Sequence, residues 1–141
     1  MLISKKEIEV RYAETDQMGV VYHANYLVWM ELGRTQLIKD LGFSYAEMEQ
    51  DGVISPVIDI NVTYKKPLRY GEVATIHTWT ETYDGFRVVY GYKILTPEED
   101  IALLGSSSHV CVKKDNFKPI IIRKKYPEWH TAYENAKKQG E

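Results

Sequence analysis

The sequence predicts an α+β fold in which a curled antiparallel sheet packs around one long helix, with a further helix near the C-terminus. Three observations support this prediction. Residues 24–41 carry apolar side chains at helical spacing, four later segments show the two-residue period of strands, and turn-forming residues separate those segments. Eleven tyrosines and three tryptophans also suit strands better than a helical bundle.

The first half of the chain is predicted to form a strand, a turn, the long helix and a short helix. The strand spans about residues 3–12, and Asp16 to Gly19 has the composition of a tight turn. The long helix runs from about Ala24 to Leu41, and Gly42 suits the position that follows a helix. Residues 45–50 form the short helix. The apolar face of the long helix comprises Tyr26, Met30, Gly33, Leu37 and Leu41, widened by Leu27, Arg34 and Ile38.

The second half is predicted to form an antiparallel meander. A second strand is followed by a third over residues 73–83 and a fourth over 86–95, which meet across the hairpin pair Asp84-Gly85. A fifth strand spans about residues 101–114, and the last helix runs from about Tyr126 to Lys138 with Pro127 in its first turn. Two faces follow from the alternation: Ile58, Ile60, Val62 and Tyr64 in the second strand, and Leu104, Ser106, Ser108, Val110 and Val112 in the fifth.

Composition narrows the class of protein. The 141 residues contain no repeat and no linker-like run, so we expect one domain over residues 1–141. With 18 Lys and Arg against 20 Asp and Glu, the net charge of −2 gives no argument for nucleic-acid binding. The single Cys111 excludes an internal disulfide, and the His residues lack metal-ligand spacing. Because no segment suits a signal peptide or a membrane span, we expect a cytoplasmic protein.

The segment from Asp16 to His23 carries the clearest chemical signal. It places a carboxylate and an imidazole on either side of a turn that leads into the long helix. The first backbone N–H groups of a helix lack acceptors within the helix and attract negative charge. Free amide donors beside a carboxylate suit attack on an activated carbonyl. Asp16 and Gly19 also fit an ordinary type I turn, which is the structural alternative.

A family resemblance rests on residues 16–26, DQMGVVYHANY. This run resembles the signature of the 4-hydroxybenzoyl-CoA thioesterase family of the hotdog fold, and in particular the branch typified by the Tol-Pal-associated enzyme. The order of elements agrees with that family over about residues 1–125. The resemblance implies hydrolysis of an acyl-CoA substrate without a cofactor. In it, Asp16 acts as a base that activates water or as a nucleophile that forms an acyl-enzyme anhydride, and the backbone N–H of His23 receives the thioester carbonyl oxygen.

The resemblance also implies an assembly, because members of the family pair their sheets edge to edge. We therefore expect a homodimer or homotetramer with sites at the subunit interface. Two other functions stay open: a hotdog dehydratase that acts on acyl-carrier-protein substrates, and a non-catalytic acyl-binding or scaffold module. Release of a thiol from acyl-CoA substrates would distinguish a thioesterase from the module.

Further residues are candidates for substrate binding. Tyr22 and Asn25 match the family signature, although Asn near a helix start is commonly a cap. Basic side chains at a pocket mouth suit the phosphates of CoA, although Lys and Arg on loops are commonly only solvated. The basic candidates are Lys65, Lys66, Arg69 and Arg87.

The long helix carries residues for which we favour a structural role. Glu31 is a possible second carboxylate, but an intrahelical ion pair with Arg34, three residues on, is the favoured interpretation. Gly33 is predicted to lie where the helix presses on the sheet, because a glycine inside a helix needs a compensating reason. Tyr26, Trp29 and Met30 are predicted to belong to the core rather than to an acyl pocket.

Overall fold

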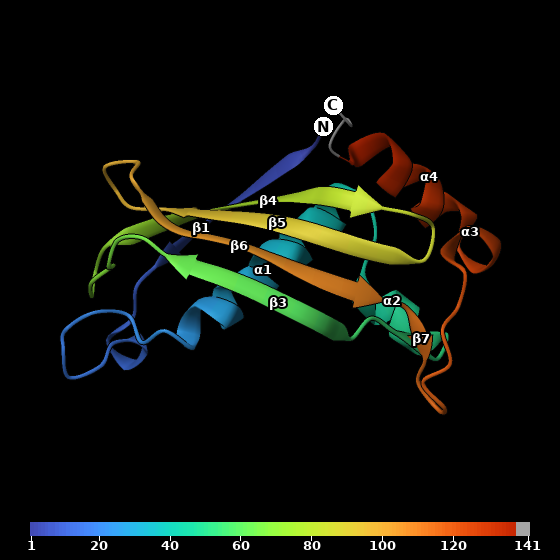
Figure 1. Ribbon diagram of the computed structural model, residues 1–141, viewed down its shortest axis with the longest axis horizontal. Helices are drawn as coiled ribbons and strands as arrows, with labels where there is room; N and C mark the ends of the chain where they lie inside the picture. The colour runs from blue at the N-terminus through green and yellow to red at the C-terminus, as the bar shows by residue number, and fades with distance from the viewer. Residues whose placement is uncertain (138–141) are drawn as a thin grey trace.

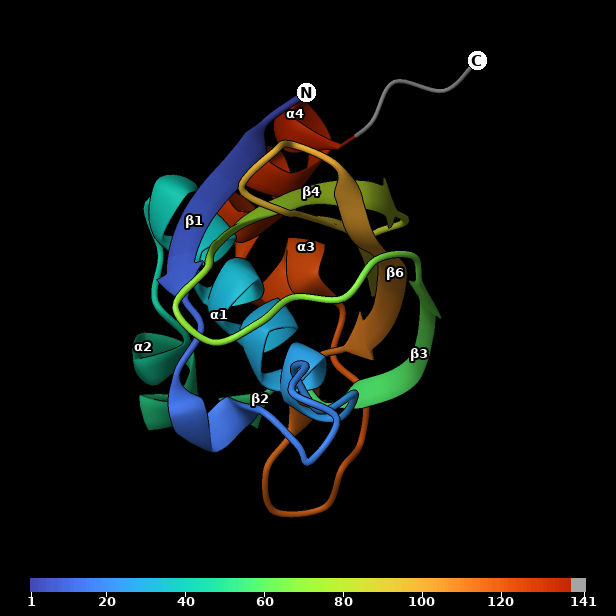
Figure 2. The ribbon, with the colours of Figure 1, turned by 90° about the vertical axis from the view of Figure 1, so that its left-hand side faces the viewer.

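In the computed structural model, which describes residues 1–137, a five-stranded antiparallel sheet curls around helix α1, as predicted (Figure 1). The strand order across the sheet is β1-β4-β5-β6-β3, and β2 pairs with β7 in a separate ribbon. Viewed from one end, the sheet covers α1 from β1 to β3 and leaves its underside open (Figure 2). The elements are β1 (Ile3–Glu9), η1 (Tyr12–Glu14), α1 (Asn25–Asp40), α2 (Tyr45–Gln50), β2 (Val53–Ile54), β3 (Val57–Tyr64), β4 (Val73–Tyr83), β5 (Arg87–Leu95), β6 (Ile101–Val110), β7 (Val112–Lys113), α3 (Ile122–Lys125) and α4 (Pro127–Ala136).

Most predicted element boundaries hold within a few residues, and the differences lie at β1, β2, β7 and α3. β1 ends at Glu9 rather than near Tyr12, because the chain turns into the short 3-10 helix η1. Helix α3 and the two-residue strands β2 and β7 were not predicted. Helix α4 begins at Pro127, one residue after the predicted start at about Tyr126, and its predicted end at Lys138 lies outside the described residues.

Helix α1 buries one face against the sheet. Tyr26, Trp29, Met30, Gly33, Leu37 and Ile38 are buried. Leu27 was predicted on this face, but its side chain is 39% exposed. The buried stripe runs through Tyr26, Trp29 and Met30, which confirms that they belong to the core. Leu27, Val28 and Leu32 therefore lie on the uncovered side of α1, and Gly42 adopts the left-handed conformation (φ 94°) that ends the helix as predicted.

Gly33 is the closest point of approach between α1 and the sheet. A Cβ atom added there would overlap Thr78 Oγ1 and lie 3.0 Å from Ile76 Cγ2, both on β4. Thr78 is fully buried, and its hydroxyl has no hydrogen-bond partner among the described residues. The prediction that Gly33 is a packing glycine is confirmed.

The predicted meander holds for β4, β5 and β6, but the second predicted strand, β3, pairs with β6 at the edge of the sheet rather than with β4. At the hairpin between β4 and β5, Gly85 has a φ of 89° and the Asp84 carboxylate accepts hydrogen bonds from the N–H groups of Phe86 (2.9 Å) and Arg87 (2.6 Å). In β6, the residues that face α1 are Leu103, Ser107 and His109, so the opposite side carries the predicted set that begins with Leu104. Polar residues thus occupy part of the buried face of β6.

We predict that Gly33→Ala destabilises the protein despite the higher helix propensity of alanine. The added methyl group should lower the free energy of unfolding by about 1–2 kcal/mol, because overlap with Thr78 outweighs the propensity gain of about 1 kcal/mol. Denaturant titration measures this change. In a Thr78→Ala background the same substitution should cost less, and an equal cost in both backgrounds would contradict the proposed contact.

Candidate active site

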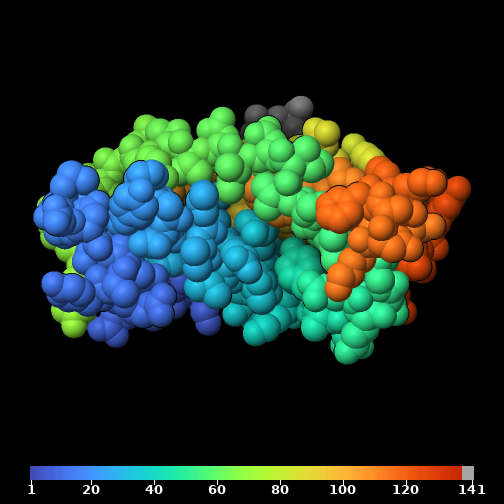
Figure 3. Space-filling view, turned by 90° about the horizontal axis from the view of Figure 1, so that it is seen from below, coloured from blue at the N-terminus to red at the C-terminus, as the bar shows by residue number. Residues whose placement is uncertain are grey.

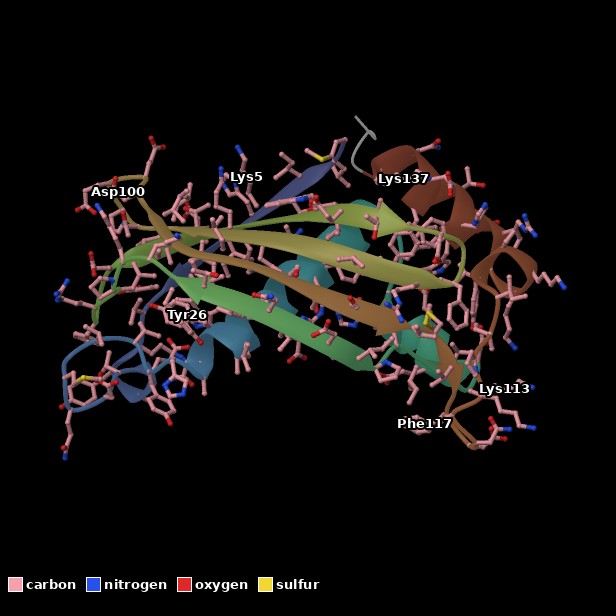
Figure 4. The ribbon with its side chains drawn as sticks, viewed as in Figure 1. Lys5, Tyr26, Asp100, Lys113, Phe117 and Lys137 are labelled. Atoms are coloured by element: carbon pink, nitrogen blue, oxygen red, sulfur yellow. The ribbon has the colours of Figure 1, made fainter. Side chains whose placement is uncertain are left out.

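A cavity of about 310 Å³ lies where α1 begins. Its walls come from the turn before α1, from the start of α1 and from the end of β3 with the loop that follows. Tyr26, which lines it, lies at one end of the molecule, and Lys113 and Phe117 lie at the other (Figure 4). Asp16 and His23 both line this cavity, so the structure brings together the two residues of the predicted catalytic pair.

The turn that carries Asp16 is held by its own backbone. The Gly19 N–H donates to the Asp16 carbonyl (2.9 Å), and the Asp16 N–H donates to the Val20 carbonyl (3.0 Å). Asp16 Oδ1 accepts a hydrogen bond from the Met18 N–H (2.9 Å). Gly19 has a φ of 79°, which glycine adopts without strain. One carboxylate oxygen thus orients the side chain, and Oδ2 accepts no hydrogen bond within residues 1–137.

His23 lies two residues before α1, and a hydrogen bond holds its backbone in place. The Tyr64 hydroxyl donates to the His23 carbonyl (2.8 Å) and so ties the end of β3 to the start of α1. Within the described part of the chain, no group accepts a hydrogen bond from the His23 N–H. The imidazole is exposed and packs on the Tyr22 ring, with centroids 4.3 Å apart. An unused amide donor therefore lies at a helix N-terminus that lines the same cavity as a carboxylate.

Glu14 anchors this arrangement, and the sequence analysis missed it. Its carboxylate is buried and accepts hydrogen bonds from the Arg11 N–H (2.8 Å) and from Trp29 Nε1 (2.7 Å). Burial acts to raise the pKa of the Glu14 carboxyl, but these hydrogen bonds outweigh it and hold the pKa below its usual value. The Glu14 carbonyl accepts from the Tyr22 N–H (2.9 Å) and from Asn25 Nδ2 (2.8 Å).

Some of the predicted substrate-binding residues line the cavity and others do not. The Asn25 side chain is committed to the Glu14 carbonyl, and the Tyr22 ring is exposed beside His23. Lys65 and Lys66 line the cavity. Lys66 Nζ also forms an exposed ion pair with Asp100 (3.0 Å).

Two predicted basic residues lie outside the cavity. Arg69 is exposed in the loop before β4, where its N–H donates to Glu72 (2.6 Å). Arg87 begins β5 opposite Val110, at the end of the sheet where β6 finishes, whereas the cavity lies near the end of β3. A single chain therefore does not bring Arg87 to Asp16.

Comparison with known proteins shows the family. The family model described as "Thioesterase-like superfamily" matches residues 10–129. This chain belongs to that superfamily. The match covers the segment that carries Asp16 and His23. It also covers every strand of the five-stranded sheet but β1.

Individual members of the superfamily agree with this assignment. The chain is 67% identical to a Bacillus subtilis protein named "Putative acyl-CoA thioesterase YneP", over 98% of this chain and all of that one. It is 29% identical to the acyl-CoA thioester hydrolase YbgC of Escherichia coli, over 83% of this chain and 87% of that one. The crystal structure of a DHNA-CoA thioesterase from Staphylococcus aureus matches with a TM-score of 0.93 and 50% identity, covering 96% of this chain and 91% of that one.

This member of the superfamily has a second cavity, of about 410 Å³, beside the C-terminal half of α1. Glu31, Arg34 and Ile38 of α1 line it together with residues near α2, with Ser55 and with His109. The favoured ion pair between Glu31 and Arg34 is wrong, because no such contact exists among residues 1–137. Arg34 Nη1 instead donates to the Tyr92 hydroxyl at 3.1 Å.

Arg34 begins a chain of hydrogen bonds that runs under the sheet. The Tyr92 hydroxyl lies 2.6 Å from Ser107 Oγ, which lies 2.8 Å from His109 Nε2. His109 Nδ1 faces the Ser55 carbonyl at 3.4 Å. Because a carbonyl only accepts, the proton of neutral His109 belongs on Nδ1, and each hydroxyl in the chain donates toward His109.

Two further features, a metal-binding cluster and a membrane-spanning helix, are absent from residues 1–137. Within residues 1–137, no cluster of three or more His, Cys, Asp or Glu side chains has the arrangement needed to hold a metal ion. In the same part of the chain, no helix combines the length and the apolar character needed to cross a membrane.

We predict that His109 makes the protein less stable at acidic pH. Burial lowers the pKa of His109 from 6.5 to about 4. As the pH falls below 6.5, His109 becomes protonated in the unfolded chain but stays neutral in the folded chain. The free energy of unfolding should therefore decrease by about 2 kcal/mol between pH 7 and pH 4.5. Urea titrations at the two pH values measure it. His109→Gln should remove this part of the decrease, and an unchanged decrease in the variant would assign the effect to other groups.

Proposed function

We propose that the chain hydrolyses acyl-CoA thioesters to a free carboxylic acid and CoA, with Asp16 and His23 as its catalytic groups. The observation that carries the proposal is the unused His23 N–H at the start of α1, in the same cavity as the Asp16 carboxylate. An amide donor that is already oriented stabilises the negative oxygen that forms when a thioester carbonyl is attacked. The names of the relatives support the same activity.

Two routes use these groups. In the first, Asp16 takes a proton from water as the water oxygen adds to the thioester carbon, and the His23 N–H holds the carbonyl oxygen. The C–S bond then breaks, and the CoA thiolate takes up a proton. In the second, Asp16 itself adds to the carbon and expels the thiolate, and water hydrolyses the resulting anhydride. Both routes need an anionic Asp16 and the same amide donor.

Basic residues near the cavity suit the charged end of CoA. Lys65 and Lys66 line the cavity, and the exposed Arg69 follows in the same loop. We propose that this loop meets the phosphates, since Lys and Arg bind phosphate through charge-assisted hydrogen bonds. Arg87 contributes only if another chain brings its end of the sheet close.

We propose that two chains pair through the open side of α1 and the edge strand β3. Val28 is 49% exposed and Leu32 is 42% exposed on α1, and Ile60 of β3 is 38% exposed. Tyr64, on the same face of β3 as Ile60, contacts the Tyr26 ring, so this face of β3 looks toward α1 (centroids 5.4 Å apart). Figure 3 shows the face on which α1 is uncovered.

The two edges of the sheet differ in the way that pairing requires. The outer edge of β3 presents unpaired backbone groups, and the strand contains no lysine or arginine. β1, at the other edge, carries Lys5 and Lys6, the kind of residue that discourages edge-to-edge pairing. We therefore place the pairing at β3, in a homodimer or in a homotetramer built from such dimers.

The finer identity also belongs to this proposal. The resemblance to the Tol-Pal-associated branch stays a prediction, because the similar proteins carry different names. YbgC, an acyl-CoA thioester hydrolase, is 29% identical, and the staphylococcal DHNA-CoA thioesterase is 50% identical. We further propose a single domain that acts in the cytoplasm, in keeping with a lone, buried Cys111.

Asp16→Asn should abolish thiol release while leaving the fold intact. The amide keeps the shape of the side chain but can neither take a proton nor attack the thioester, so kcat should fall by at least about a hundredfold. Release of CoA is followed with a thiol reagent on acetyl-, dodecanoyl- and benzoyl-CoA. Asp84→Asn, at the far hairpin, is the matched control. Full activity of Asp16→Asn would remove Asp16 from the mechanism, and binding without turnover in the unaltered protein would favour the acyl-binding module.

Leu32→Arg should convert the assembly to monomers. A charged side chain at the centre of the proposed interface must be buried against its own copy, and each uncompensated buried charge costs several kcal/mol. Sedimentation velocity measures the mass. Ile3→Arg, on the opposite edge strand, is the control and should leave the mass unchanged. A monomeric unaltered protein at micromolar concentration would overturn the interface.

A further inference from the structure

The segment from Lys113 to Lys125 concentrates the positive charge of the chain. It contains six Lys and Arg residues and one Asp, so its net charge is +5. The whole chain has a net charge of −2, and the residues outside this segment therefore carry −7. All six basic side chains are exposed, and none forms an ion pair with a carboxylate of residues 1–137. Positive charge that the chain itself does not neutralise attracts an anionic partner.

The fold gathers these cations at one end of the molecule. Lys113 ends β7, Lys114 follows it and Lys125 ends α3, and all three line a cavity of about 580 Å³. Asp51 and Asp115 line it as well, but neither forms an ion pair with a lysine in the described part of the chain. In Figure 1, β7 and α3 lie at the end of the molecule opposite the turn that leads into α1.

A hairpin after β7 adds exposed apolar side chains to this charge. The Lys113 N–H donates to the Lys118 carbonyl (2.9 Å), and the Phe117 N–H donates to the Lys113 carbonyl (2.8 Å). Phe117 is 60% exposed and has a φ of 58°, a left-handed conformation that is costly for a bulky side chain. Ile121, just beyond the hairpin, is 45% exposed. Since strain of this kind clusters at functional sites, the exposed phenylalanine beside two lysines indicates a contact surface.

We propose that residues 113–125 dock the protein on a membrane surface that contains anionic phospholipids. The lysines lie against the headgroup phosphates, and Phe117 and Ile121 enter the boundary between the headgroups and the acyl chains. Clusters of about four to eight Lys and Arg are typical of segments that bind anionic lipids. Buried apolar area adds to the electrostatic attraction. The inference does not depend on the proposed hydrolysis.

The shape of this surface favours a membrane over nucleic acid. Proteins bind single-stranded nucleic acids in basic grooves, in which aromatic side chains stack on successive bases. Here the large exposed apolar residues are one phenylalanine and one isoleucine, and the hairpin projects from the molecule as the orange loop at the bottom of Figure 2. A projecting hairpin reaches a planar surface while the opposite end of the molecule stays away from it. Charges farther away than about 8 Å are largely screened at physiological salt, so the negative remainder of the chain opposes docking only weakly.

Flotation with lipid vesicles tests the docking. The unaltered protein should bind vesicles of phosphatidylcholine with about 30% phosphatidylglycerol at least about tenfold more tightly than vesicles of phosphatidylcholine alone. This binding should weaken when the NaCl concentration rises from about 0.05 to about 0.5 M, because salt screens the attraction. Equal binding to both kinds of vesicle, or binding to neither, would overturn the proposal.

Two variants with a matched control assign the binding to this surface. Lys113→Gln/Lys125→Gln should lower the affinity for the anionic vesicles about tenfold. Lys5→Gln/Lys6→Gln removes the same charge from β1 and should change the affinity far less, so equal losses in the two variants would contradict the proposed surface. Phe117→Asn should weaken binding several-fold without a loss of stability in urea titration, because asparagine tolerates the left-handed conformation. It also provides the measurement if circular dichroism shows that the lysine variant is misfolded.

Two competitors distinguish the lipid from other anions. CoA added at constant ionic strength should leave the protein on the vesicles, and displacement by CoA would assign the lysines to the phosphates of CoA instead. Binding to a single-stranded oligonucleotide without binding to the vesicles would assign the surface to nucleic acid. Vesicle binding by a protein that hydrolyses no acyl-CoA would contradict the proposed function and leave this inference standing.

Discussion

The carboxylate of Glu14 is the constraint on which the end of the molecule that carries the candidate active site depends. A buried carboxylate is costly unless hydrogen bonds compensate it, and here the donors come from Arg11, just after β1, and from Trp29, in α1. The side chain therefore joins the end of the first strand to the long helix. Its own carbonyl accepts from Tyr22 and Asn25, on the far side of the turn that carries Asp16. Both ends of the turn are thus fixed to one residue, and an exposed loop presents Asp16 in a defined position.

Helix α1 has one side buried against the sheet and one side exposed. Its buried side is pressed so closely onto β4 that only glycine fits at position 33, and the contact leaves the Thr78 hydroxyl without a partner among the described residues. Its other side is left uncovered with Val28 and Leu32 exposed. The two cavities lie toward opposite ends of α1. If two chains pair through this side as proposed, a second copy turned by 180° brings the unlike ends of the two helices together.

Features that depend on neighbouring residues could be predicted from the sequence. The period of α1, the alternation of the strands, the Asp84-Gly85 hairpin and the Asp16–His23 junction are all local, and the structure has each of them. The face of α1 was less certain because the helix has apolar residues on both sides, and so Leu27 was placed in the core although it is exposed. Two-residue strands such as β2 are too short to show a period.

Three features that depend on the tertiary fold were missed. Glu14 has no motif, because its partner Trp29 is fifteen residues away and on another element. Arg34 was assigned to Glu31, three residues before it, whereas its partner Tyr92 is 58 residues away. The roles of Lys65 and Arg87 were indistinguishable in sequence, and only the fold sets one at the Asp16 cavity and the other at the opposite end of the sheet.

The energetics of Arg34 point to a role beyond stability. A guanidinium taken partly out of water loses hydration, and one hydrogen bond to a neutral hydroxyl replaces only part of it. An apolar side chain of similar length would fill the same space without that loss of hydration. Tyr92, Ser107 and His109 add further polar groups to the core, and each must be hydrogen-bonded to be tolerated. A network of this kind holds one cation in place at the wall of a cavity, where Arg34 is half-buried.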